Sequence, residues 1–182
     1  MRRPTKDTHC SHCGSPFGAT DEYPRRCNSC TRLTFANPTP VSVVLLPVDH
    51  DGRHGLLVIR RAIPPHVGRL ALIGGFVDAG ESWQRAAARE VREETGADVD
   101  AETLEPFWFT STPDAESILL FALAQPIKHL PTFVANREVS ERGLIFGPQG
   151  LEEIMAFPLH TEVATRYFSS RDCAAPHDYR AV

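Results

Sequence analysis

The sequence lacks long apolar runs. No stretch approaches the roughly 18–20 residues needed to span a bilayer, and the basic start MRRPTKDTHC lacks the apolar stretch of about 7–15 residues that a secretory signal needs. A dominant charge of one sign is also missing, because 19 Lys and Arg stand against 23 Asp and Glu, a net charge of -4. These absences argue against a membrane-spanning protein and against nucleic acid or an anionic membrane as partner. We expect a cytoplasmic protein.

Residues 1–34 are also short of aliphatic side chains and have no periodic apolar face. A segment this short cannot build a core from side chains alone, so something else must hold it together. It carries six Lys or Arg against three Asp or Glu, a charge of +3, which leaves -7 for the rest of the chain. We expect a small module at 1–34 and a main domain at 35–182, which opens with the linker FANPTP.

Cysteines can supply the missing core of this module. Two Cys-x-x-Cys pairs stand thirteen residues apart, formed by Cys10, Cys13, Cys27 and Cys30. This spacing predicts a tetrahedral structural zinc site, which leaves no open coordination position for catalysis. Since four thiolates complete the shell, His9 and His12 are expected not to be ligands, and Cys173 is a leftover thiol.

A competing interpretation is that the arginines of this module contact nucleic acid. They are Arg2, Arg3, Arg25, Arg26 and Arg32. Aromatic residues on which bases could stack are lacking between them, apart from Phe17 and Tyr23. We therefore expect zinc and no nucleic acid.

Apolar patterning after residue 40 predicts alternating groups of strands and helices. The expected strands are 41–48, 55–61, 70–73, 106–112, 117–124 and 138–146, and the expected helices are 82–95, 151–155 and 161–169. A turn at Gly74–Gly75 is expected after the strand at 70–73, and the tail after Arg171 is expected to be loose. This order indicates an α+β or mixed α/β fold.

The helix at 82–95 concentrates carboxylates. At 100° per residue, Glu90, Glu93 and Glu94 lie at about 0°, 300° and 40°, hence on one face. Mg²⁺ or Mn²⁺ would remove the repulsion between them. A solvated acidic face is the alternative, but Gly75 and Glu81, just upstream in a Gly-rich segment, favour a ligand site.

The segment GFVDAGESWQRAAAREVREETGA, residues 75–97, resembles the Nudix box. The positions of that pattern are filled by Gly75, Glu81, Arg89, Glu90, Val91, Glu93, Glu94, Gly96 and Ala97. The resemblance covers these 23 residues, and the flanking strand pattern extends it over about 40–168. It implies a mixed α/β fold, an α/β/α sandwich with a mixed sheet, here preceded by a small zinc ribbon.

The resemblance also implies roles for these residues. The implied ligands of Mg²⁺ or Mn²⁺ are Glu90, Glu93, Glu94 and the carbonyl of Gly75. Arg89 and Glu81 would orient them, and a further carboxylate from a later loop would join them, with Glu138 and Glu141 as candidates. The implied reaction is attack of water on a phosphorus atom of a diphosphate carried on a nucleoside or similar group.

The substrate is less sharply indicated. Zinc ribbons accompany relatives that cleave dinucleotides such as NADH, but their motif Ser-Gln-Pro-Trp-Pro-Phe-Pro is replaced here by EPFWFTSTP, and the coenzyme A pattern is absent. Pro113 stands sixteen residues after Ala97, as in ADP-ribose-cleaving relatives. We expect an ADP-ribose-like substrate, with NADH or FAD as the alternative. Arg60 and Arg69 are candidates for the phosphates, and Trp108 for a base.

A second class of function is a Nudix-derived regulator that senses a nucleotide while the ribbon contacts DNA. Such regulators usually have an eroded box and an added winged helix, whereas the box in this chain is complete. We therefore expect a hydrolase whose partner is a nucleotide-type small molecule, with neither nucleic acid nor a membrane as partner. The oligomeric state is left open, with a homodimer as one outcome.

Overall fold

The computed structural model describes residues 8–18, 23–171 and 175–182. It divides into two compact units, Met1–Pro38 and Thr39–Val182, and the division falls inside the FANPTP segment. No helix in the described ranges is long and apolar enough to cross a membrane.

The first unit is built on two short antiparallel pairings. Strand β1 (Arg25–Arg26) pairs with β2 (Leu33–Thr34), and His9 forms an isolated antiparallel bridge with Pro16. Each pairing encloses one Cys-x-x-Cys turn, so the two pairs of thiols are presented in the same way.

A four-stranded sheet forms one half of the second unit. Its order is β7-β3-β9-β8, with bounds Ile73–Phe76, Thr39–Leu45, Ser117–Leu123 and Glu105–Ser111. Strands β3 and β9 run parallel, while β7 and β8 are antiparallel to their neighbours. The sheet is therefore mixed, as the sequence led us to expect.

An antiparallel sheet forms the other half. Its order is β11-β10-β5-β4, with bounds Arg180–Ala181, Val139–Ile145, Arg53–Arg61 and Pro47–His50, and β6 (Leu70–Ala71) also pairs with β5. The expected single strand at 41–48 is corrected here, because the chain leaves the mixed sheet after Leu45 and enters the antiparallel sheet at Pro47. Leu46 lies at this step, fully buried, and its carbonyl accepts from the Leu57 amide at 2.9 Å.

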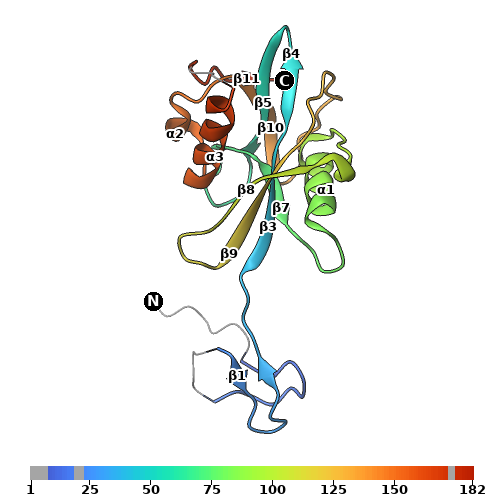
Figure 1. The fold of residues 1–182 in the computed structure, drawn as a ribbon, viewed down its shortest axis with the longest axis vertical. Helices are drawn as coiled ribbons and strands as arrows, with labels where there is room; N and C mark the ends of the chain where they lie inside the picture. Colours follow the sequence, from blue (N-terminus) through green and yellow to red (C-terminus); the bar gives the residue numbers. More distant parts are fainter. Residues whose placement is uncertain (1–7, 19–22, 172–174) are drawn as a thin grey trace. The chain divides into compact units, whose positions relative to one another are not determined.

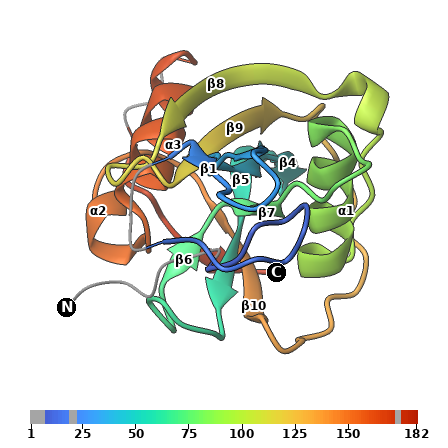
Figure 2. The same ribbon diagram turned by 90° about the horizontal axis from the view of Figure 1, so that it is seen from below.

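Helices cover both sides of these sheets. Helix α1 (Trp83–Thr95) lies on one side, and α2 (Leu151–Ile154) and α3 (Pro158–Ser169) lie on the other (Figures 1 and 2). One buried apolar cluster includes Val44 and Val91, and a second includes Phe121 and Tyr167. A short 3-10 helix, η1 (Ala101–Thr103), follows α1. The α/β/α sandwich with a mixed sheet is confirmed.

The tail after Arg171 is not loose where it is described. Strand β11 pairs with β10, and the Tyr179 hydroxyl donates to the Glu141 carboxylate. Gly143 makes room for the Tyr179 ring, since a β-carbon on Gly143 would overlap it. A tail docked through a two-residue strand and one ring gives no periodic signal in the sequence. Residues 172–174, with Cys173, lie outside the described residues.

Candidate functional site

Helix α1 positions the carboxylates, and its two ends form as expected. Ser82 is the N-cap, and its hydroxyl accepts from the Arg85 amide at 3.3 Å. Gly96 closes the helix in the left-handed region, with φ of 75°, and donates its amide to the Arg92 carbonyl. The helix is fastened to the mixed sheet, because the Ser42 hydroxyl donates to the Trp83 carbonyl at 3.0 Å.

Four glutamates from two segments line one pocket of about 200 Å³. Glu90, Glu93 and Glu94 come from α1, and Glu138 comes from the loop before β10; Asn136 and Arg137 complete the lining. The structure thus brings Glu138 to the carboxylate helix. Glu141 lies elsewhere, hydrogen bonded to Arg60 at 3.0 Å and to Tyr179.

Glu94 is the most deeply placed of these carboxylates, with 8% of its surface exposed. Burial raises its pKa to about 8, and the neighbouring carboxylates of Glu90 and Glu138 contribute in the same direction. The pKa of Glu90 is also raised, chiefly by burial. Four glutamates line this pocket against the single arginine of its lining, Arg137, and a divalent cation would balance the excess negative charge.

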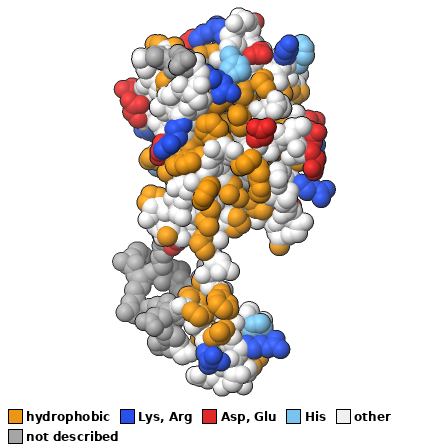
Figure 3. Space-filling model, in the orientation of Figure 1, with side chains coloured by type: hydrophobic (Ala, Val, Ile, Leu, Met, Phe, Trp, Pro, Cys, Tyr) orange, Lys and Arg blue, Asp and Glu red, His pale blue; other side chains and the backbone are white. Residues whose placement is uncertain are grey.

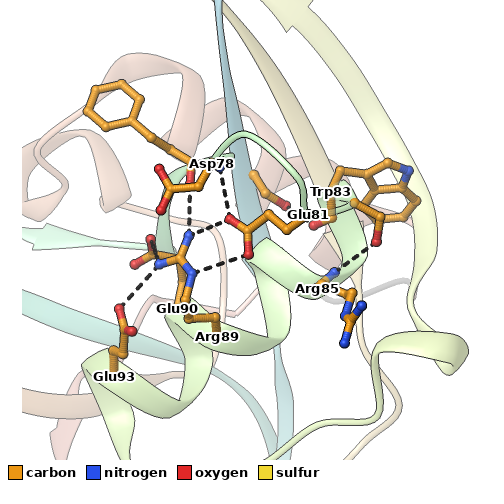
Figure 4. Close-up of polar contacts among 10 residues, drawn as sticks. Asp78, Glu81, Trp83, Arg85, Arg89, Glu90 and Glu93 are labelled. Carbon is orange, nitrogen blue, oxygen red and sulfur yellow. Dashed lines mark hydrogen bonds and ion pairs between the residues drawn. The ribbon is translucent and has the colours of Figure 1, made fainter.

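Arg89 holds the loop and the helix together (Figure 4). Its guanidinium lies 2.8 Å from Glu81 Oε1, 2.7 Å from Glu90 Oε1 and 3.2 Å from Glu93 Oε2, and it donates to the Phe76 carbonyl at 2.9 Å. These hydrogen bonds raise the pKa of Arg89, and Arg89 lowers the pKa of Glu81. Arg89 and Glu81 thus have the contacts of residues that orient ligands.

Gly74 and Gly75 do not form the expected turn but lie inside β7, paired with Val43 and Ser42. The Gly74 amide donates to Glu94 Oε2 at 2.9 Å. A β-carbon on Gly74 would overlap the Ser42 carbonyl, and one on Gly75 would overlap the Glu90 carboxylate. The missing side chains let the strand and the acidic helix approach each other closely.

The oxygen-rich lining of the pocket fits a hard divalent cation. Mg²⁺ and Mn²⁺ prefer carboxylate oxygens, a backbone carbonyl and water to nitrogen or sulfur ligands. Glu94 Oε2 and Glu90 Oε1 are oriented by Gly74 and Arg89, while the second oxygen of each makes no hydrogen bond with the described part of the chain. Those two oxygens are therefore available to bind a metal.

The four cysteine sulfurs of the first unit lie within 4.8 Å of one another. Cys10 Sγ is 3.7 Å from Cys30 Sγ, and Cys13 Sγ is 3.6 Å from Cys27 Sγ. A tetrahedron with zinc–sulfur bonds of about 2.3 Å has edges of about 3.8 Å, so the geometry fits zinc. Hydrogen bonds from Ser15 lower the pKa of Cys13 to about 6, which favours the thiolate that binds metal.

The flanking histidines lie outside this set of sulfurs. His9 Nδ1 is 2.9 Å from the Thr8 hydroxyl, and His12 Nδ1 is 3.4 Å from an Arg32 nitrogen. Neither histidine belongs to the group of four residues whose ligand atoms lie together, and the expectation that they are not ligands stays a prediction.

None of the residues expected to contact substrate lines the acidic pocket. Arg60 donates to Glu141 and to the Gly68 carbonyl at 2.8 Å, and Arg69 donates to the Met155 carbonyl at 3.1 Å. Pro113 is exposed in the turn between β8 and β9. Their roles toward substrate therefore stay predictions.

Trp108 belongs to a larger, apolar hollow of about 350 Å³ beside β8. Its lining is Trp83, Pro106, Phe107, Trp108, Phe109, Leu120 and Phe121. Hydrophobic side chains gather on this face between α3 and α1 (Figure 3). The Trp108 ring stacks on Phe121 at 5.7 Å and carries the Arg166 guanidinium at 4.6 Å. Because no titratable group lines this hollow, hydrolytic chemistry is better placed in the smaller acidic pocket.

Comparison with known proteins agrees with this site. The NUDIX domain family matches residues 38–165. The NAD-capped RNA hydrolase NudC of Chromobacterium violaceum is 31% identical over 119 residues, which is 64% of this chain and 42% of that protein. NAD-capped RNA hydrolase ndx-9 of Caenorhabditis elegans is 36% identical over 75 residues, 41% of this chain and 19% of that protein. This chain thus spans less than half the length of these curated relatives.

Solved structures agree in fold. A NUDIX hydrolase from Nitrosomonas europaea superposes with a TM-score of 0.74 at 24% identity, covering 94% of this chain and 97% of that one. The NUDIX domain of Shewanella oneidensis NrtR, complexed with ADP ribose, gives 0.57 at 19% identity, covering 75% and 90%. The NUDIX domain family matches more than half of the residues of this chain, and the chain therefore belongs to that family.

Proposed function

We propose that this protein is a hydrolase that cleaves the diphosphate linkage of a nucleoside diphosphate derivative with the help of Mg²⁺ or Mn²⁺. The observation that carries the proposal is the convergence of Glu90, Glu93, Glu94 and Glu138 on one pocket beside Gly75. Bound there, a divalent cation neutralises charge on the phosphate oxygens and favours attack by water. A regulator that only senses a nucleotide would not need this complete set of carboxylates.

The residues of the pocket have separate tasks in this reaction. Water forms a new bond to phosphorus while the bridging phosphorus–oxygen bond breaks, so the products are two phosphate monoesters. A carboxylate of the pocket accepts the proton of the water. Glu90, Glu93, Glu94 and the Gly75 carbonyl would hold the metal. Arg89 and Glu81 keep those carboxylates in position through the contacts described above.

For the first unit, we propose a structural zinc ion held by its four cysteines. The sulfur separations of 3.6–3.7 Å support this, and neither buried apolar cluster includes a described residue of this unit. A complete sulfur shell would leave no position for substrate, so the ion would stabilise the fold of the first unit and take no part in hydrolysis.

Two classes of substrate are considered. An ADP-ribose-like compound is the first, because EPFWFTSTP replaces the NADH-type motif. An NAD-type dinucleotide, free or at the end of an RNA, is the second, and the sequence relatives, which are NAD-capped RNA hydrolases, favour it. The solved neighbour with ADP ribose is too distant in sequence to decide between them.

A substrate panel tests the proposal. Purified protein is incubated in Mg²⁺ or Mn²⁺ with ADP-ribose, NADH, FAD, diadenosine polyphosphates and NAD-capped RNA, and the products are identified by mass spectrometry. We expect phosphate monoesters as products and a higher kcat/KM for ADP-ribose than for NADH. NADH ahead by tenfold would overturn the preference, and no cleavage of any diphosphate would overturn the hydrolase itself.

A further inference from the structure

We infer that Asn136 is a positioning residue that holds Glu138 against the carboxylate helix. The inference rests on the proposed function, because it assigns Glu138 to the same pocket. Asn136 was not singled out from the sequence, where it is one polar residue in the loop segment ANREVSERG.

Asn136 uses both atoms of its side-chain amide. Its Oδ1 accepts from the Glu138 amide at 2.8 Å and from the Val139 amide at 2.9 Å. Its Nδ2 donates to the Glu93 carbonyl at 3.0 Å. Its own backbone amide donates to the Val139 carbonyl at 2.9 Å. One side chain thus folds the loop tightly and ties it to α1.

The hydrogen bond from Asn136 to α1 is made to a backbone carbonyl near the end of the helix. Glu93 is one of the last four residues of α1. The carbonyls of these residues find no backbone amide donor within the helix. A donor from outside the helix is therefore favoured at this carbonyl. The bond runs from the loop that carries Glu138 to the helix that carries the other three glutamates of the pocket.

Glu138 has one further backbone anchor, since its carbonyl accepts from the Ala62 amide at 2.7 Å. The Glu138 amide is hydrogen bonded to Asn136 and the Glu138 carbonyl to Ala62, so the backbone is fixed on both sides of Glu138. Its side chain is exposed and has no hydrogen bond within the described ranges. The direction of the carboxylate is therefore set by the backbone, and the Asn136 side chain links that backbone to α1.

A double-mutant cycle tests this role. Asn136→Ala is expected to lower kcat about tenfold with little change in KM, as for residues that orient ligands. In a Glu138→Gln background, the same substitution should change kcat less than twofold, because no carboxylate is left to position. Equal losses in both backgrounds would mean a general structural role and would overturn the inference.

A matched control and a readout without substrate complete the test. Asp100 also accepts from the amide two residues on, Glu102, at 3.0 Å, but it is not among the residues that line the pocket, so Asp100→Ala should leave kcat unchanged. Amide hydrogen exchange at Glu138 and Val139 should accelerate in Asn136→Ala but not in Asp100→Ala. If exchange at these two amides is unchanged in Asn136→Ala, the inference is overturned, even where the wild type hydrolyses a diphosphate. If exchange is accelerated but the wild type cleaves no diphosphate, only the proposed function is overturned.

Discussion

Gly75 and Glu90 lie so close together that any side chain on Gly75 would displace the Glu90 carboxylate. A β-carbon there would overlap the carboxylate of Glu90, which is oriented by Arg89 at 2.7 Å. The glycine of the Nudix box is thus required for the position of a carboxylate on the helix fifteen residues later, in addition to any role of its own carbonyl.

Gly75→Ala should therefore impair activity more than folding. The end of a glutamate side chain can move aside, so we expect a small change in Tm, whereas the displaced Glu90 carboxylate should weaken Mn²⁺ binding and lower kcat by about tenfold or more. Thermal unfolding, Mn²⁺ titration and steady-state kinetics check this. Ordinary kcat and Mn²⁺ affinity in a folded Gly75→Ala variant would show that the contact has no role.

Glu94→Gln should lower kcat by about 10²-fold or more while the fold remains intact. The amide removes the charge proposed to hold the metal, an effect of about 3 kcal/mol on the transition state. Because the raised pKa of about 8 already favours the protonated carboxyl at pH 7 without metal, the metal-free Tm should change little. Glu152→Gln, an exposed position, is the control. Wild-type turnover of Glu94→Gln in saturating Mg²⁺ would contradict the proposed role, and we expect the same loss for Glu93→Gln.

Protein purified without chelator should contain about one equivalent of zinc per chain, lost in Cys10→Ser or Cys27→Ser. Both cysteines are buried, with 2% and 1% of their surface exposed, so a serine there leaves an incomplete shell. Elemental analysis of wild type and variants is the measurement. Iron in place of zinc would correct the metal but keep the site, whereas protein without bound metal would overturn it.

His160 should make stability depend on pH. Burial lowers the pKa of His160 to about 3, and its Nδ1 accepts from the Leu72 amide at 3.1 Å, so the folded state holds a neutral ring. Above pH 6.5 both states are neutral there. As pH falls from 6.5 toward 3, the unfolded state gains a proton that the folded state does not, so this contribution to stability is lost.

His160→Asn keeps an acceptor for Leu72 and removes the titration. Between pH 6.5 and pH 5, stability of the variant relative to wild type should rise by about 1.5 kcal/mol. Glu90 and Glu94 have raised pKa values, so their contribution to stability increases as the pH falls, opposite to that of His160. Both proteins contain these glutamates, and comparing the variant with wild type therefore isolates the effect of His160. Urea unfolding followed by tryptophan fluorescence reads the second unit, which contains both tryptophans. A difference independent of pH would show that His160 titrates normally.

Local chemistry was readable from the sequence alone. The helix with its caps at Ser82 and Gly96 matches the structure because capping and periodicity act within a few residues. The spacing of the two cysteine pairs placed all four sulfurs together for the same reason. The Nudix box gave the family and therefore the sandwich, since its pattern fixes a strand, a loop and a helix at once.

Tertiary structure decided what depends on residues far apart in the chain. Glu138 and Glu141 are equivalent as sequence, but the loop before β10 turns back to α1, whereas Glu141 lies past an irregularity in β10 and bonds Arg60, so only Glu138 reaches the pocket. The roles of Asn136 and of the C-terminal Tyr179 are likewise set by partners far away in sequence. From the sequence, Arg60 was a candidate for binding phosphate, but in the structure β10 places Glu141 beside it and the two side chains are hydrogen bonded. Periodicity reports which face of an element is buried, but not which element covers it, and that choice is made by packing.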